Sequence, residues 1–110
     1  MKVGLIRCKQ TEDMCPATTS FKVIQDKKLA FEGITQDVTL VGVNTCGGCP
    51  GKKAVTRVAE MIKRGADTIV FSSCISKGTP IGFPCPHAEI IREAVLKKMG
   101  ELIKIIEYTH

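Results

Sequence analysis

The sequence has no tryptophan, one tyrosine and few other aromatic residues. No aromatic side chain alternates with basic ones, so the net charge of +5 is better explained by lysines on solvated helix faces than by a nucleic-acid-binding surface. No apolar run approaches the length of a membrane span, and nothing at the start resembles a signal peptide. We therefore expect a cytoplasmic protein, and neither a membrane nor a nucleic acid as its partner.

The length of 110 residues predicts a single domain, residues 1–110, with enough chain to bury a core without disulfides. Four apolar runs rich in β-forming residues lack polar alternation, which is typical of parallel strands covered on both faces. These runs are 3–6, 38–43, 68–72 and 102–106. Helical patterns separate them, at 51–64 and 86–99 and, more weakly, from Pro16 onward.

This alternation predicts a three-layer α/β/α sandwich of the flavodoxin/Rossmann-like kind. We expect a four-stranded parallel sheet in the order 2-1-3-4, with a switch point between the first and third strands. The helical spacing also predicts which side chains face the sheet. They are Phe21 and Ile24 in the first helix, Val55, Val58, Ala59 and Ile62 in the second, and Ile90, Ile91, Ala94 and Val95 in the third.

Six cysteines in such a domain indicate metal or redox chemistry rather than a disulfide framework. The cysteines and histidines fall after predicted strands or in the loops that leave them. They are Cys8 and Cys15 after the first strand, Cys46 and Cys49 after the second, Cys74, Cys85 and His87 after the third, and His110 after the fourth. Because the carboxyl ends of parallel strands share one edge, we expect all of these side chains on one side of the domain.

The central motif is Cys46-Gly47-Gly48-Cys49, in which the glycines permit positive φ and allow both sulfurs to face one point. This spacing is used by zinc and iron–sulfur sites, and also by thioredoxin-like dithiols. The further cysteines on the same edge favour a metal ion. Two alternatives stay open: a thiol-based redox or sulfur-transfer enzyme that uses the Cys46/Cys49 pair, and a glycine-rich loop that binds an anion through its amides.

Three cysteines precede proline, which suits the first helical turn. We therefore expect Cys15, Cys49 and Cys85 near helix N-termini, where the dipole favours thiolate. His87 is either a polar residue of a first helical turn or a ligand or base. His110 is either a loosely held terminal residue or a ligand. The long loop 74–87 either folds over the thiols or forms a surface connection.

These residues give the chain a family resemblance. It resembles the CGGC-domain family of small prokaryotic proteins over nearly its whole length. The shared residues are Arg7-Cys8, Cys15-Pro16, Ala30-Phe31, the run 46–51, Ser73-Cys74, Cys85-Pro86-His87 and Thr109-His110. Tyr108 departs from the pattern, because a small residue is expected there.

The resemblance implies metal binding. It suggests as ligands Cys8, Cys15, Cys46, Cys49, Cys74, Cys85, His87 and His110. Zinc is the first expectation, because mixed Cys and His ligands suit it. An iron–sulfur cluster is the alternative, because ligation by cysteine alone is available.

Overall fold

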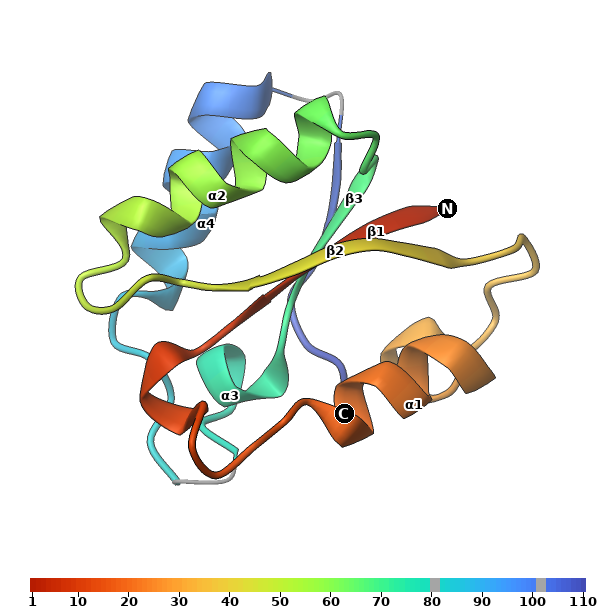
Figure 1. Ribbon diagram of the computed structural model, residues 1–110, viewed down its shortest axis with the longest axis horizontal. Coiled ribbons are helices and arrows are strands. Elements are labelled where there is room, and N and C mark those ends of the chain that lie inside the picture. Colours follow the sequence, from red (N-terminus) through yellow and green to blue (C-terminus); the bar gives the residue numbers. More distant parts are fainter. Residues whose placement is uncertain (80–81, 101–102) are drawn as a thin grey trace.

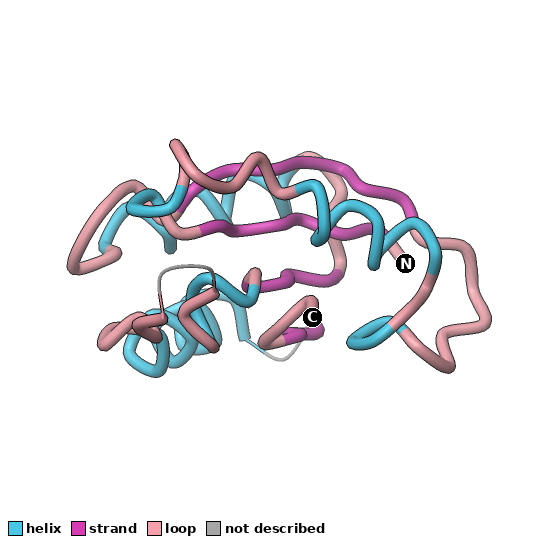
Figure 2. The backbone as a smooth tube through the Cα atoms, turned by 90° about the horizontal axis from the view of Figure 1, so that it is seen from below, coloured by secondary structure: helices cyan, strands magenta, loops and turns pink. Residues whose placement is uncertain are grey.

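The computed structural model describes residues 1–79, 82–100 and 103–110. In these ranges four parallel strands form one sheet in the order β2-β1-β3-β4. The strands are β1 Lys2–Arg7, β2 Thr39–Thr45, β3 Thr68–Phe71 and β4 Lys104–Ile106. Figure 2 shows the four strands lying next to one another. The predicted α/β class and strand order are therefore confirmed, although Leu102, the predicted start of the fourth strand, lies outside the described residues.

The helices cover both faces of the sheet (Figure 1). They are α1 Thr18–Asp26, α2 Lys52–Lys63, the short α3 Ser73–Ser76 and α4 Ala88–Met99, with 3-10 turns η1 Lys9–Thr11 and η2 Leu29–Phe31. Helices α2 and α4 pack together on one face, and α1 with η2 packs on the other. None of the helices in the described ranges combines the length and apolar character needed to cross a bilayer.

Alternate residues of the central strand divide the core between these two layers. Val3 and Leu5 of β1 pack against the α1 layer, whereas Ile6 packs against the α2 and α4 layer. Strands β1 and β3 are buried on both faces, as predicted for parallel strands. Strand β2 lies at the sheet edge and is half exposed, with Leu40 and Val43 reaching solvent, so the prediction fails for this strand.

The predicted inner faces of the helices are correct only in part. In α2 the buried side chains are Ala54, Val58 and Met61. Val55 and Ile62 are half-buried at the margin of the core.

In the other two long helices an apolar residue predicted to face the sheet points outward. Phe21 of α1 is 38% exposed and Ile90 of α4 is 66% exposed, while Ile24, Ile91 and Val95 are buried. A short amphipathic helix has apolar residues on two adjacent faces, and only packing against the sheet selects between them.

Candidate thiol and imidazole site

The CGGC loop connects β2 to α2 and is held at both ends. The Cys46 amide donates to the Arg7 carbonyl at 2.8 Å, which extends the β1–β2 pairing by one residue. The Gly51 amide donates to the Gly48 carbonyl at 2.8 Å and closes the turn. Gly47 has φ +80°, and a Cβ there would lie 2.6 Å from Lys53 Cβ. The loop therefore folds back onto the first turn of α2.

Arg57 of α2 fixes the start of this loop. Its guanidinium donates to the Thr45 carbonyl at 3.1 Å and to Thr45 Oγ1 at 2.9 Å. It also donates to Asn44 Oδ1 at 3.1 Å. A guanidinium that lies close to Gly47 is thus already paired with protein oxygens. Sequence reasoning missed Arg57, because an arginine in a helix is usually a solvated residue.

Three of the six thiols are buried in the core. Cys8, Cys46 and Cys74 are each less than a tenth exposed and belong to one apolar cluster with residues of β1, β3, α2 and α4. Cys85 is half-buried against the same cluster, whereas Cys49 is exposed. None of the six forms a disulfide. Within the central motif, one cysteine therefore faces the core and the other faces solvent.

The thiols of Cys8, Cys46, Cys49, Cys74 and Cys85 lie close enough for their charges to interact, and we call them the thiol cluster. Burial raises the pKa of Cys8, and negative charge on Cys46 and Cys74 raises it further. Burial also raises the pKa of Cys85, to which Cys46 and Cys49 add. Without a cation nearby, these two thiols stay protonated at neutral pH.

Backbone amides give the cluster some polar support. The Cys8 amide donates to Cys74 Sγ at 3.1 Å, and the His87 amide donates to Cys85 Sγ at 3.4 Å. The bond from the His87 amide favours the thiolate form of Cys85. At Cys85 the effect of burial on the pKa outweighs that of the His87 amide.

The helix N-termini lie further from the sulfurs than the sequence predicts. Cys15, Cys49 and Cys85 each stand two residues before the N-caps of α1, α2 and α4, which are Ala17, Gly51 and His87. The intervening prolines precede the N-caps instead of occupying the first turn. The expected stabilisation of thiolate is therefore wrong for Cys85, whose pKa is raised. Cys74 lies in the first turn of α3, which the sequence did not indicate.

Cys15 and His110 occupy a separate part of the edge. Together with Cys74 they line a cavity of about 220 Å³ between the start of α1 and α3, which Ser72 also lines. The Arg7 guanidinium donates to the Cys15 carbonyl and ties the loop 8–17 to the end of β1. Burial and the positive charge of Lys77 lower the pKa of His110, so its imidazole is neutral at pH 7.

The end of the described chain is held by hydrogen bonds and is not loose. The His110 amide donates to Ser73 Oγ at 2.9 Å, and the His110 carbonyl accepts from Ser73 Oγ at 2.8 Å and Lys77 Nζ at 2.9 Å. His87 lies apart from His110, in a cavity of about 300 Å³ that it lines with Pro50, Gly51 and Ile91 among others. The two histidines therefore flank different cysteines.

The predicted gathering of all eight side chains thus separates into groups. The first group is the thiol cluster, whose five thiols lie within range of one another's charge. Cys15 and His110 form the second group, because they line one cavity, which Cys74 also reaches. His87 lies apart, beside the end of the CGGC loop. Across residues 1–79, 82–100 and 103–110, no three Cys, His, Asp or Glu side chains are already arranged to hold an ion. The loop 74–87 brings Cys85 to the cluster through a bond from its amide to the Ile75 carbonyl at 2.8 Å, although positions 80 and 81 lie outside the description.

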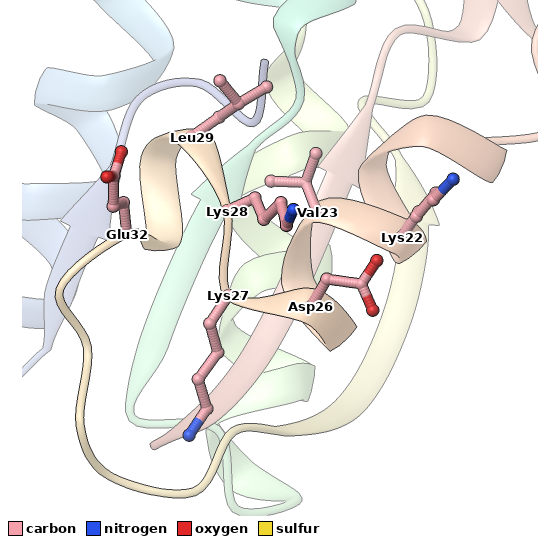
Figure 3. A pocket seen from close by; sticks show the side chains of 7 residues that line it. All are labelled: Lys22, Val23, Asp26, Lys27, Lys28, Leu29 and Glu32. Carbon is pink, nitrogen blue, oxygen red and sulfur yellow. The ribbon is translucent and has the colours of Figure 1, made fainter.

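A larger cavity lies elsewhere. It measures about 570 Å³ and lies between α1 and η2 (Figure 3). Its lining comprises Lys22, Val23, Asp26, Lys27, Lys28, Leu29 and Glu32. In Figure 3 the charged ends of Lys22 and Lys27 point in different directions, so the lining presents no convergent chemistry.

Comparison with known proteins identifies relatives over the whole chain. The CGGC domain family matches residues 2–110. The uncharacterized protein MJ0582 of Methanocaldococcus jannaschii is 36% identical over 112 residues, covering 96% of this chain and 81% of that protein. The uncharacterized protein MJ0766 of the same organism is 34% identical over 71 residues, covering 64% of this chain and 98% of that protein. No solved structure matches the chain. The chain therefore belongs to the CGGC domain family.

Proposed function

We propose that this protein binds a metal ion through the thiol cluster. Cys46 and Cys49 supply two ligands, and two or more of Cys8, Cys74 and Cys85 complete the set. The observation that carries the proposal is that five free thiols from four separate segments lie within range of one another's charge at one edge of the sheet, three of them in the core. Membership of a cysteine-rich family supports it.

The chemistry of the donors fits a soft or borderline cation. Thiolate is the ligand form, and thiols that raise one another's pKa gain most when a cation neutralises them together. Zinc is the ion we propose, because it accepts four sulfur ligands, or sulfur with imidazole, in tetrahedral geometry. An iron–sulfur cluster uses the same donors and is the rival within this proposal.

Binding requires the less buried ligands to approach the core. Cys8, Cys46 and Cys74 are held by strands and packing, whereas Cys49 is exposed and Cys85 is half-buried in a loop. The ion would therefore order the two loops around three fixed sulfurs. His87, next to Cys85, and His110, beside Cys74, are the imidazoles available to the site.

The experiment is a zinc titration of reduced, metal-free protein in a chelator buffer, with Cys49→Ser and Cys15→Ser compared. Cys15 is the matched control, because it is a partly exposed cysteine before a proline but lies outside the thiol cluster. We expect one ion per chain for the wild type and for Cys15→Ser, and an affinity at least tenfold lower for Cys49→Ser. Equal affinity for all three proteins, or no binding by the wild type, would contradict the proposal.

We propose thiol–disulfide exchange as the second candidate, because the exposed Cys49 and the buried Cys46 differ as an attacking and a resolving thiol differ. The Cys49 thiolate would attack one sulfur of a substrate disulfide and release the other as thiolate. Cys46 would then displace the remaining substrate thiolate by bonding to Cys49, so that two electrons pass to the substrate.

The two candidates differ in their metal content and in their response to Cys49→Ser. A redox enzyme purifies without stoichiometric metal, and the variant keeps the wild-type melting temperature while it loses reduction of a test disulfide. A metal protein loses ion and stability together.

A further inference from the structure

An apolar groove lies beside the exposed thiol of Cys49. It measures about 300 Å³ and runs between the N-terminal halves of α2 and α4, which pack on the same face of the sheet (Figure 1). Pro50 and Val55 line it from one side, and Ile90 and Ala94 line it from the other. None of its lining residues in the described ranges carries a carboxylate. Because Pro50 follows Cys49 directly, the groove begins where the thiol is exposed.

Ile90 forms an exposed apolar wall of this groove. Its side chain is 66% exposed, whereas the next residue, Ile91, is buried against Gly51. The fold therefore closes the bottom of the groove with Ile91 and leaves Ile90 at the open side. Covering an exposed isoleucine with another apolar side chain is favourable. The groove thus offers an anchor for one apolar side chain of a partner.

On the other side of Cys49, basic side chains surround the two glycines of the motif. Lys53 and Arg57 lie close to the first glycine, and Lys9 lies close to the second. We call Lys9, Lys53 and Arg57 the basic rim. The two lysines of the rim are exposed to solvent, as Cys49 is. The thiol therefore stands between an apolar groove and a set of positive charges.

The charge of the basic rim is not neutralised within the part of the chain that the structure describes. Its members take no part in the ion pairs found there, and the guanidinium of Arg57 donates to uncharged oxygens. Glu12 and Asp13, which follow Lys9, form no ion pair there either. Lys52, which is exposed at the groove, adds a further positive charge. The surroundings of the CGGC loop thus carry a surplus of positive charge, which attracts an acidic partner.

We propose that the groove and the basic rim form a docking surface for an acidic protein, which presents a cysteine to Cys49. An apolar residue on one side of that cysteine fills the groove, and acidic residues on its other side face the rim. The partner group is a thiol or a disulfide, because exchange at sulfur is the chemistry that Cys49 offers. A second copy of this chain fits poorly, because its net charge of +5 would be repelled by the rim.

This inference deepens the proposed function and rests on it for the purpose of docking. Cys49 is the exposed member of the proposed ligand set, so a partner thiol meets the site there first. The same surface serves the second candidate function, in which Cys49 attacks a substrate disulfide. Docking itself needs only the groove and the rim, and it is therefore tested on metal-free protein.

The test uses short peptides whose cysteine is activated as a mixed disulfide with thionitrobenzoate. They carry leucine or glycine on one side of the cysteine and two aspartates or two lysines on the other. Each is made in both sequence orders, and the faster order is compared. The Cys49 thiolate bonds to the peptide sulfur and releases the coloured thionitrobenzoate anion. Subtracting the rate of Cys49→Ser isolates the reaction of Cys49 in the reduced, metal-free protein.

We expect the peptide with leucine and aspartates to react fastest. At low salt the aspartate peptides should react about tenfold faster than the lysine peptides, and this ratio should approach one in concentrated salt, which screens charge. The leucine peptides should react about fivefold faster than the glycine peptides at either salt concentration. These ratios compare peptides on one protein, so a change in the intrinsic reactivity of Cys49 cancels.

Matched variants assign each preference to its part of the surface. Replacing Lys9 and Lys53 together by glutamate should abolish the preference for aspartate. The control replaces Lys22 and Lys28, which are exposed in the α1 layer on the opposite face, and changes the net charge equally. It should keep the preference. Ile90→Ser should abolish the preference for leucine, whereas serine in place of the equally exposed leucine at position 29 should not.

The outcomes separate docking from the proposed function. Equal wild-type rates for all peptides overturn the docking surface even if a variant fails to fold, and so do equal effects of the rim and control pairs. A wild-type dimer that Ile90→Ser dissociates, seen by sedimentation velocity, gives the groove to a second copy and overturns it too. A wild type that binds no zinc overturns the proposed function, while the peptide rates still decide whether Cys49 has a docking surface.

Discussion

The CGGC loop contacts α4 at Gly51, and this contact requires a residue without a side chain. Replacing Gly51 by alanine tests this requirement. Gly51 is the N-cap of α2, with φ +92° and ψ +17°. A Cβ there would overlap Cδ1 of Ile91 and lie 2.8 Å from its Cγ1. Ile91 is 3% exposed, and its side chain would have to turn away from the added methyl group.

Two costs add in this variant. A left-handed backbone costs a residue with a Cβ about 1–2 kcal/mol, and forcing an extra methyl group into a packed contact costs about 1–3 kcal/mol. We therefore expect Gly51→Ala to lower the free energy of unfolding by about 2–5 kcal/mol, a large share of the ~5–15 kcal/mol typical of a domain. The displaced loop should also expose Cys46, which would then be alkylated faster in the folded protein.

Gly33→Ala is the matched control. Gly33 has φ +82°, close to that of Gly51, but nothing lies within 4 Å of an added Cβ. This variant should lose only the free energy of the left-handed backbone, about 1–2 kcal/mol. The assay is urea denaturation of reduced, metal-free protein followed by circular dichroism. Equal losses in the two variants would show that the contact with Ile91 does not require glycine at position 51, and would refute the reasoning.

Three further predictions follow from particular contacts. Arg57→Lys cannot reproduce the guanidinium bonds to Thr45, so it should lower the free energy of unfolding by about 1 kcal/mol, read by urea denaturation, and speed alkylation of Cys46. Asp67, whose pKa is lowered by the Lys2 amide and the Thr68 hydroxyl, stabilises the fold above the pKa of the unfolded carboxyl, about 3.9. Asp67→Ala should therefore cost about 1 kcal/mol at pH 7 in thermal melts, with the difference shrinking as the pH falls below about 4. A chelator should lower the melting temperature of zinc-loaded wild type and leave Cys46→Ser unchanged; an equal shift in both proteins would argue against ligation by Cys46.

The sheet was predictable because its signals are local and strong. The runs that form β1 and β3 are apolar without alternation, and right-handed crossovers leave few strand orders for four parallel strands. The same rule placed Cys8, Cys46 and Cys74 at the carboxyl edge, where the structure buries them in one cluster. For these three cysteines, their position just after a strand was enough to predict that they lie at the same edge of the sheet.

The orientation of the helices and the surroundings of the other site residues depend on tertiary contacts, which the spacing of residues in the sequence does not reveal. Whether Phe21 or Val23 of α1 faces the core depends on how the helix docks, because residues two apart lie on nearly opposite sides of a helix. Cys15 stands apart because Arg7 draws its carbonyl to the end of β1. The hydrogen bonds that bury Thr109 are made with residues far from it in the chain, Ser20 and Ser73. Serine and threonine residues this far apart in the chain form no periodic pattern from which their hydrogen bonds could be predicted.

The central claim is that the thiol cluster holds a metal ion, and the most direct measurement is elemental analysis of protein purified anaerobically without chelator, with thiol counting and a visible spectrum on the same sample. The account predicts about one zinc ion per chain, no colour and ligand thiols in the cluster that react only after the ion is removed, while Cys15 reacts in both states. Iron and inorganic sulfide in the sample, together with visible absorption, would indicate an iron–sulfur cluster on the same ligands instead of zinc. Protein without stoichiometric metal, with all six thiols reduced, would contradict the claim.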